Sequence, residues 1–323
     1  MVGAADRSRP RDGEARRKSS VRGKTDDMRI VDGFEGEAPF DLVWPSRVAA
    51  PLLLASPHSG RDYPRDFLTM TRLDRVTIRR SEDAFVDDLC LAAAGGRLPV
   101  LAARFPRAWL DVNRERLELD PRMFTGAVPA DANTRSTRVA GGLGTIPRIV
   151  TERDDIYRGP IPIAEAMARI ERAYEPYHAT LRHSLARLHG EFGRAVLIDC
   201  HSMPSSQRIA SADGRVDIVL GDRHGKSCHP ALTDLAATLL RDAGYRVTLN
   251  KPYAGGYTTE AYGRPERGLE ALQIEISRAL YLNETTITRT TGFAPLARDF
   301  TRFIDRLVAG FAAIYGDLRQ AAE

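Results

Sequence analysis

Histidine and acidic side chains stand in or just after apolar runs of this chain, at positions that suit hydrolytic chemistry. His58 follows the run PLLLASP, His201 follows AVLIDC, and Glu275 lies within ALQIEIS. Two imidazoles and a carboxylate are a common ligand set for catalytic zinc, which keeps a further position for water. A separate carboxylate that is not a ligand can serve as general base toward that water. These residue types therefore predict metal-dependent hydrolysis.

The acidic ligand is expected from the segment SEDAFVDDL, residues 81–89. Asp83 and Asp87 are four residues apart, which at helical spacing places both on one face. Glu275 suits the role of general base, because a glutamate inside an apolar run is costly to bury unless its charge has a partner. Hydrogen-bonded structural histidines, and an Asp pair that faces water or caps a helix, remain the alternatives.

The elements that position these residues are expected to be strands alternating with helices. Strand-like apolar runs occupy residues 51–60, 98–105, 195–203, 216–222, 245–250 and 269–277. Several are continuously apolar, as in strands that are covered on both faces. Helical periodicity is clearest over 163–191, and further helices are expected over about 232–243 and 295–315. The alternation predicts an α/β sandwich around a largely parallel sheet.

The placement of the polar residues agrees with that architecture. In open α/β sheets, ligands bind in the crevice beyond the carboxyl ends of the strands. The stretch 106–160 is rich in Gly, Pro and Arg and has weak periodicity. We therefore expect it to form an ordered loop region over a site.

Composition narrows the class of protein. Of the 323 residues, 43% are hydrophobic and 28% charged, which is ordinary for a globular protein, and the formal net charge is +4. Residues 1–29 are rich in Arg and Lys with almost no large apolar residues, so a disordered basic tail is expected before a single domain over 30–323. Nucleic-acid binding by this tail is the alternative; otherwise we expect neither nucleic-acid nor membrane partners.

Cysteine usage and hydropathy predict a cytoplasmic protein. The three cysteines, Cys90, Cys200 and Cys228, have no framework spacing, which argues against a secreted disulfide scaffold. The sequence has no apolar run long enough to cross a bilayer and no apolar stretch of the signal-peptide kind near residue 1. Nothing in it marks an oligomer interface.

A series of motifs runs in order along the chain. They are SPHSGRDYP (56–64), EDAFVDDL (82–89), WLDVNRERLELDPRMF (109–124), GLGTIPRIV (142–150), PYH (176–178), LIDCHSMPS (197–205), VLGDRHG (219–225), NKPYAGGYTT (250–259) and LQIEISRALYL (272–282). Over about residues 37–320 the sequence thereby resembles the N-formylglutamate amidohydrolase family. The resemblance implies a single-domain, three-layer α/β sandwich with a mixed, largely parallel sheet, of the zinc carboxypeptidase or phosphorylase/hydrolase-like kind.

The resemblance also implies a metal site, most simply for Zn²⁺. His58 and His201 match the metal-ligand histidines of the family. The wider carboxypeptidase-like pattern places a glutamate three residues after the first histidine, where this sequence has Arg61. The acidic ligand is then expected from EDAFVDDL, and we favour Asp83 over its rivals Glu82 and Asp87. Asp199 is expected either to orient the ring of His201 or to face water.

N-formylglutamate carries two carboxylates, for which arginine offers bidentate geometry. Asn113 and Arg114 in DVNRER resemble the Asn–Arg pair that grips a terminal carboxylate in carboxypeptidase-like enzymes. Further candidates for substrate binding are Arg278, Arg138, Arg148, Tyr257 and Thr258, the last two in a segment whose glycines let backbone approach a ligand. Surface charges and a turn after a strand are the ordinary alternatives.

The expected reaction yields formate and L-glutamate, late in histidine breakdown, with Glu275 taking a proton from a metal-activated water and giving it to the departing amine. A deacylase of the same fold that removes another acyl group, and a binding protein without activity, are alternatives. So is a covalent hydrolase using Cys200 or Ser59. Cys200 adjoins His201, but strand neighbours point to opposite faces, which is poor geometry for a nucleophile and its base.

Overall fold

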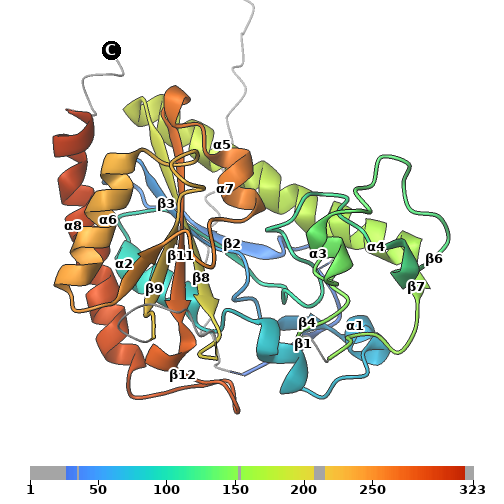
Figure 1. Cartoon of the computed structure of the whole chain (residues 1–323). Helices are drawn as coiled ribbons and strands as arrows, with labels where there is room; N and C mark the ends of the chain where they lie inside the picture. Colours follow the sequence, from blue (N-terminus) through green and yellow to red (C-terminus); the bar gives the residue numbers. More distant parts are fainter. Residues whose placement is uncertain (1–26, 35, 152–153, 207–214, 317–323) are drawn as a thin grey trace, which may run out of the picture.

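The structure, a computed structural model, describes residues 27–34, 36–151, 154–206 and 215–316 (Figure 1). The expected basic tail lies outside the described residues as far as residue 26. Its last residue, Arg29, opens strand β1 (Arg29–Val31) and donates from Nε to Asp62 Oδ1 at 2.6 Å. Within the described ranges, every helix is too short or too polar to span a membrane.

A seven-stranded mixed sheet forms the centre of the described structure, in the order β10-β9-β11-β8-β3-β5-β2. Strand β9 is antiparallel to β11 and β2 is antiparallel to β5, whereas the other neighbours are parallel. The strands are β2 (Phe40–Val43), β3 (Leu52–Ser56), β5 (Val100–Ala103), β8 (Ala195–Met203), β9 (Ile218–Gly221), β10 (Val247–Leu249) and β11 (Leu269–Ser277). The mixed, largely parallel sheet is confirmed, and so are the six predicted strands. Strand β2 was not predicted, because FDLV is a short, half-buried edge strand without an apolar run.

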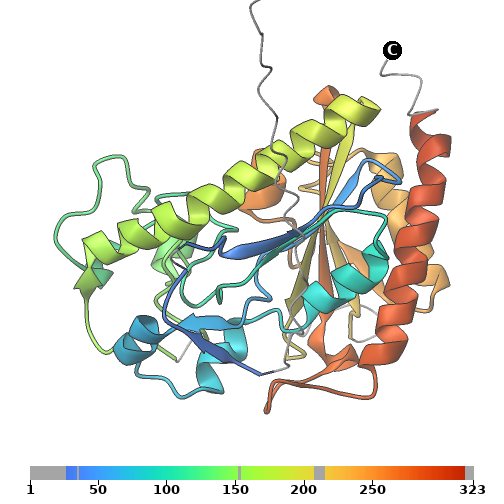
Figure 2. The ribbon, with the colours of Figure 1, turned by 180° about the vertical axis from the view of Figure 1, so that it is seen from behind.

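Helices cover both faces of the sheet, which confirms the three-layer sandwich (Figures 1 and 2). One face carries α2 (Val86–Ala94), α6 (Pro230–Asp242) and α8 (Phe293–Tyr315). The other carries α4 (Ile163–Arg169), which continues through a π-helical turn (Ile170–Tyr174) into α5 (Glu175–Phe192). The helices predicted over 163–191, 232–243 and 295–315 are therefore present, whereas for α2 the sequence offered only the helical spacing assumed between Asp83 and Asp87.

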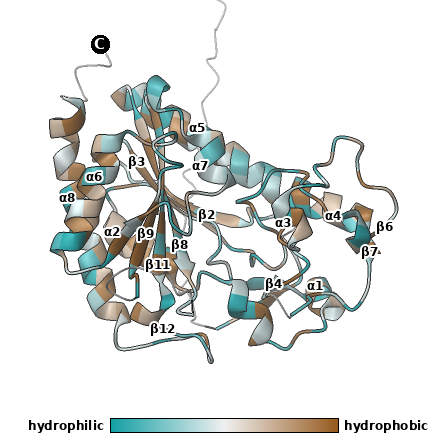
Figure 3. Ribbon diagram, in the orientation of Figure 1, coloured by the Kyte–Doolittle hydropathy of each residue, from teal (hydrophilic) through white to brown (hydrophobic). Residues whose placement is uncertain are grey.

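Alternate residues of the central strands enter the two cores. On β8, Val196 and Ile198 pack with α2, α6 and α8, and Leu197 packs with the α5 layer. Burial on both sides explains why the first four residues of β3 and of β8 are apolar without interruption. The hydropathy colouring shows the central strands mainly in the hydrophobic colour (Figure 3).

Short elements and loops connect the main strands and helices. Strand β4 (Asp62–Pro64) pairs with β1, β6 (Phe124–Thr125) with β7 (Ile161–Pro162), and β12 (Leu282–Asn283) with β13 (Thr288–Arg289). The short helices are α1 (Arg65–Met70), α3 (Thr137–Ala140) and α7 (Tyr257–Tyr262), with 3₁₀ turns at Thr77–Ser81, Pro121–Met123, Pro265–Arg267 and Arg278–Leu280. Residues 106–160 hold few regular elements, as expected of the predicted loop region.

We predict that Ile198→Ala lowers the free energy of unfolding by about 2–5 kcal/mol, because Ile198 is fully buried in the central strand and its truncation leaves a cavity. Leu249→Ala, on the edge strand β10 where the leucine is 37% exposed, should cost less than about 1 kcal/mol. Urea denaturation of both variants measures the difference. Equal losses would contradict the assignment of the core.

Candidate metal centre and its cleft

Three parallel neighbours, β11, β8 and β3, bring the candidate residues to one edge of the sheet. His58 lies two residues beyond the end of β3, and His201 lies near the carboxyl end of β8. Glu275 on β11 is the register partner of His201. The strand-end positions read from the sequence therefore do converge, as the crevice rule for α/β sheets requires.

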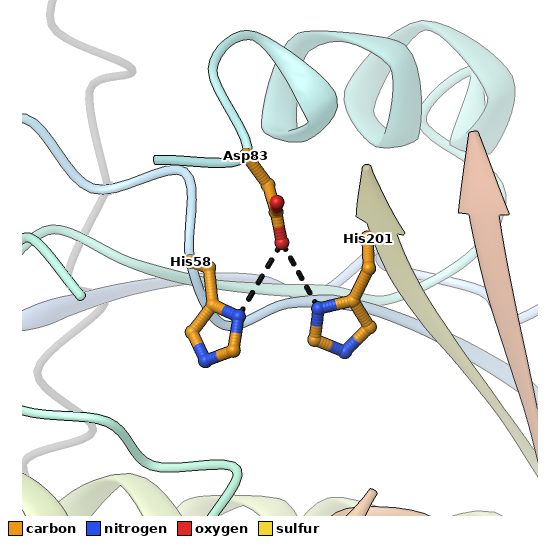
Figure 4. A group of neighbouring side chains, drawn as sticks. All are labelled: His58, Asp83 and His201. Atoms are coloured by element: carbon orange, nitrogen blue, oxygen red, sulfur yellow. Dashed lines mark hydrogen bonds and ion pairs between the residues drawn. The ribbon is translucent and has the colours of Figure 1, made fainter. Parts of the chain in front are cut away.

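His58, Asp83 and His201 form a buried cluster whose ligand atoms all lie within 4.8 Å of one another (Figure 4). Asp83 Oδ2 is 3.0 Å from His201 Nδ1 and 3.3 Å from His58 Nδ1. Donors about 2.0–2.1 Å from a tetrahedral zinc ion stand roughly 3.3 Å apart, so the two distances from Asp83 to the imidazoles are those of neighbouring ligands of one ion. His58 Nδ1 is buried and has no hydrogen-bond partner in the described part of the chain, as expected of a nitrogen that serves as a ligand.

The outward nitrogen of each imidazole meets a second carboxylate. His58 Nε2 is 2.8 Å from Asp111 Oδ1, and His201 Nε2 is 3.0 Å from Asp199 Oδ2. Metal-binding histidines are characteristically held in this way, which fixes the ring and aims its other nitrogen at the ion. Asp199 is fully buried, so the alternative in which it faces water is wrong.

The charged groups of the cluster shift one another's pKa values. Burial alone would lower the pKa of His201, but Asp199 and Asp83 hold it well above its ordinary value. Burial would likewise raise the pKa of Asp83, yet the neighbouring His201 and His58 hold it well below the usual range. The carboxylate is thus ionised and needs positive charge beside it, which a protonated imidazole or a metal cation can supply.

Asp83 is fixed by contacts to three other segments. Its backbone N–H donates to the His58 carbonyl at 3.0 Å, and Ser202 Oγ donates to Asp83 Oδ1 at 2.9 Å. Arg278 donates to the Glu82 carbonyl at 2.7 Å and lies 3.4 Å from Asp83 Oδ1. These contacts leave Oδ2 aimed between the two imidazoles.

The helical spacing used to relate Asp83 to Asp87 is wrong. Helix α2 begins only at Val86, and Phe85 before it has a left-handed backbone with φ 65°. Asp83 therefore precedes the helix and shares no helix face with Asp87, and that turn is what directs it at the histidines.

The rival acids have other partners. Glu82 accepts from Tyr63 at 2.7 Å and from Arg79 at 3.1 Å, and Asp87 pairs with Arg61 at 3.0 Å. Arg61, which replaces the glutamate of the wider pattern, thus belongs to a separate ion pair. Of the three acids considered, the structure brings only Asp83 to the histidines.

Glu275 lies beside the cluster with one oxygen held. Gln273 Nε2 donates to Glu275 Oε1 at 2.8 Å, and the side chain lines the cleft described below. Burial raises the pKa of Glu275 to about 7; the carboxylates of Asp83 and Asp199 add to the rise, whereas His201 and Arg107 oppose it. A carboxyl that titrates near neutrality can accept and return a proton, as a general base must.

A cleft of about 1470 Å³ opens over the cluster. Among its lining residues are four of the predicted substrate-binding residues, Asn113, Arg114, Arg138 and Arg278. Tyr257 and Thr258 are not among the described residues that line it, and neither is Arg148. Instead the segment just before α7 lines the wall, from Pro252 to Gly256.

Asn113 lies between that wall and the cluster of His58, Asp83 and His201. Its Nδ2 is 3.2 Å from His201 Nε2, and its Oδ1 accepts from the backbone N–H of Thr258 at 2.8 Å. A Cβ on Gly256 would stand 2.5 Å from the Asn113 amide, so glycine there permits the close approach. Thr258 thus acts through its backbone on Asn113, and Tyr257 packs against His178 with ring centroids 5.8 Å apart.

The arginines of the motifs are largely engaged by the protein itself. Arg114 donates to the carbonyls of Leu143 at 2.6 Å and Asn113 at 2.7 Å and lies 3.3 Å from Asp111. Burial lowers the pKa of Arg114 to about 10, and neighbouring guanidiniums contribute. The donors of Arg278 go to Ser202 Oγ and to two backbone carbonyls, so Arg278 is an anchor of the Asp83 loop.

Sequence reasoning missed Asp111 and Arg107. Asp111 Oδ1 lies 2.8 Å from His58 Nε2, and Asp111 Oδ2 accepts a hydrogen bond from Arg107 Nε at 3.0 Å. Arg107 also lines the cleft. Asp111 lies within the same DVNR string as Asn113, two residues before it, so the motif contained the signal. Arg107 lies in a loop without periodicity that nothing in the sequence distinguishes from other arginines.

The covalent alternatives are disfavoured by geometry. Cys200 is fully buried on the opposite face of β8 from His201, and a hydrogen bond with Cys90, together with burial, raises its thiol pKa well above the ordinary value. Ser59 is buried and donates to the Asp83 carbonyl at 2.8 Å. Neither side chain lines the cleft within the described residues.

Comparison with known proteins gives consistent matches. A family model described as N-formylglutamate amidohydrolase matches residues 50–282. An N-formylglutamate deformylase of Pseudomonas putida is 31% identical over 242 residues, which cover 73% of this chain and 83% of the relative. One from Pseudomonas aeruginosa is 32% identical over 243 residues, which cover 74% of this chain and 84% of the relative.

Solved structures agree with these sequence matches. The crystal structure of an N-formylglutamate amidohydrolase from Ralstonia eutropha JMP134 has a TM-score of 0.79 and 38% identity, covering 84% of this chain and 98% of that chain. A gene product from Agrobacterium tumefaciens shares the fold with a TM-score of 0.61 at 18% identity, covering 85% of this chain and 96% of that chain.

We predict that the purified protein binds about one equivalent of a divalent metal, and that His58→Gln loses most of it because one of the three donors is removed. His183→Gln, which changes an exposed histidine of α5, should keep the wild-type content. Elemental analysis after dialysis measures the metal, and circular dichroism checks folding. A folded His58→Gln protein with undiminished metal would refute the site.

Proposed function

The chain belongs to the N-formylglutamate amidohydrolase family, and on that premise we propose that it hydrolyses N-formyl-L-glutamate to formate and L-glutamate with the help of a divalent metal. The observation that carries the proposal is the His58–Asp83–His201 cluster beside Glu275 at the base of an arginine-lined cleft. Residues 30–323 would form the catalytic domain.

The donor set suits zinc best, since imidazole and carboxylate are ordinary zinc ligands. His58 Nδ1, His201 Nδ1 and Asp83 Oδ2 would hold the ion, while Asp111 and Asp199 keep the two rings in place. Bound there, the ion supplies Lewis acidity, which lowers the pKa of water and polarises the formyl carbonyl.

Glu275 would move the proton. Its Oε1 is held by Gln273, and the carboxylate takes a proton from the attacking water as the new C–O bond forms. It then delivers that proton to the glutamate nitrogen as the C–N bond breaks, so one water is consumed and formate and the free amine result. Burial, which raises the pKa of Glu275 to about 7, makes the carboxylate a stronger base and its acid form a usable donor near neutral pH.

The substrate's negative charge would be met by the cleft wall. Arg114 and Arg107 both contact Asp111, so they lie one residue away from the metal cluster and suit a carboxylate close to the scissile amide. Asn113 would keep its place beside His201 as a neighbour of that carboxylate. A role in histidine breakdown, in the cytoplasm, is the setting we propose for this reaction.

We predict that Glu275→Gln lowers kcat for formate release from N-formyl-L-glutamate by about 10²–10⁴-fold while the bound metal stays at the wild-type level. The amide keeps the size of the side chain but cannot accept the proton. Glu260→Gln, an exposed change on α7, serves as the control.

Formate and glutamate are assayed together in wild type and both variants. Undiminished turnover by Glu275→Gln would remove Glu275 from the mechanism, and a metal-loaded wild type that releases no formate would refute the proposed substrate.

A further inference from the structure

Among the described residues, five arginines line the cleft, and they differ in how the protein holds them. They are Arg80, Arg107, Arg114, Arg138 and Arg278. Arg278 anchors the Asp83 loop through Ser202 and the carbonyls of Arg80 and Glu82, and Arg80 lies 3.5 Å from Asp154 on an exposed part of the rim. The other three form a group on the wall, which we call the arginine cluster: Arg107, Arg114 and Arg138.

The arginine cluster has more positive than negative charge. Among the described residues, two acids form ion pairs with its three guanidiniums: Asp111, which contacts Arg107 and Arg114, and Glu118, which is 3.7 Å from Arg138. Asp111 also contacts His58, so its negative charge does not balance the arginines alone. Burial lowers the pKa of Arg114 most, and the positive charges of Arg107 and Arg138 lower it further, so both of these guanidiniums are close enough to repel that of Arg114. An anionic ligand in the cleft would relieve that repulsion.

The three side chains of the arginine cluster differ in solvent exposure. The side chain of Arg114 is 9% exposed, that of Arg107 25% and that of Arg138 33%. Arg114 Nε donates to the carbonyl of Leu143, whose own N–H donates to the carbonyl of Arg138 at the end of α3. Arg114 contacts Asp111, which in turn contacts His58, whereas the ion pair of Arg138 among the described residues is with Glu118, so Arg138 is the member outside the Asp111 contacts.

Of the three arginines, Arg138 also makes the fewest side-chain hydrogen bonds to the described residues. Its guanidinium makes no hydrogen bond to the residues that the structure describes, and the distance of 3.7 Å to Glu118 is too long for one. The side chain can therefore turn its planar fork toward a carboxylate in the cleft without breaking an internal hydrogen bond.

We propose that Arg138 binds the side-chain carboxylate of the substrate and so restricts the enzyme to N-formyl amino acids with an acidic side chain. This inference rests on the proposed function. In N-formylglutamate the α-carboxylate is two bonds from the amide nitrogen and the side-chain carboxylate is four. With the formyl group at the metal cluster, the inner pair Arg107 and Arg114 suits the near carboxylate and Arg138 suits the far one.

The test compares N-formyl-L-glutamate with N-formyl-L-glutamine, which has the same shape without the side-chain charge. Arg138→Gln should lower kcat/KM for N-formyl-L-glutamate by roughly 10- to 150-fold, chiefly through KM, since a charge-assisted hydrogen bond is lost. The value for N-formyl-L-glutamine should change less than about 3-fold, because that substrate never had the bond. Arg135→Gln, an exposed arginine that precedes α3, is the matched control.

Binding of both compounds to metal-loaded Glu275→Gln protein, with and without Arg138→Gln, is measured by calorimetry and does not depend on turnover. A loss of affinity confined to N-formyl-L-glutamate supports the inference even if the wild type hydrolyses neither compound. The absence of hydrolysis would refute only the proposed function. If Arg138→Gln weakens both compounds alike, or leaves the preference unchanged in an active enzyme, Arg138 does not select the substrate.

Discussion

One buried carboxylate, that of Asp83, stands between two imidazoles, and much of the surrounding structure holds it there. A buried carboxylate is tolerated only when it is paired and hydrogen-bonded. Three strand ends, the turn before α2 and the Arg278 anchor all contribute contacts to this arrangement. The left-handed residue Phe85 matters in the same way, because a helix that began earlier would carry Asp83 away from the histidines.

Charge is arranged in two zones. Four carboxylates, those of Asp83, Asp111, Asp199 and Glu275, gather around the two histidines, and this inner zone favours a cation. The wall of the cleft carries the arginine cluster and favours an anion. Asp111 belongs to both zones, since one of its carboxylate oxygens contacts His58 and the other accepts a hydrogen bond from Arg107. A substrate with a neutral amide and two carboxylates matches this division, with the amide over the inner zone.

Much of this architecture could be predicted from the sequence, and the failures have physical causes. Strands buried on both faces are continuously apolar, so β3, β8 and β11 were evident, and the polar residues at their ends followed. Which acid joins the histidines could not be read from spacing, because the helical period does not apply before Val86. Arg107 and Asp111 act through tertiary contacts in an irregular loop, where no period distinguishes them. Arg278 was recognised as notable, but only the packing shows that its donors go to the Asp83 loop.

The central claim is that one metal ion held by His58, Asp83 and His201 is required for amide hydrolysis. The most direct measurement is to strip the full-length protein with a chelator and add Zn²⁺ back in fractional steps, recording bound metal and the rate of formate release from N-formyl-L-glutamate at each step. The account predicts a rate that rises in proportion to occupancy and levels off at about one equivalent. Full activity in metal-free protein, or a rate that does not follow occupancy, would contradict it.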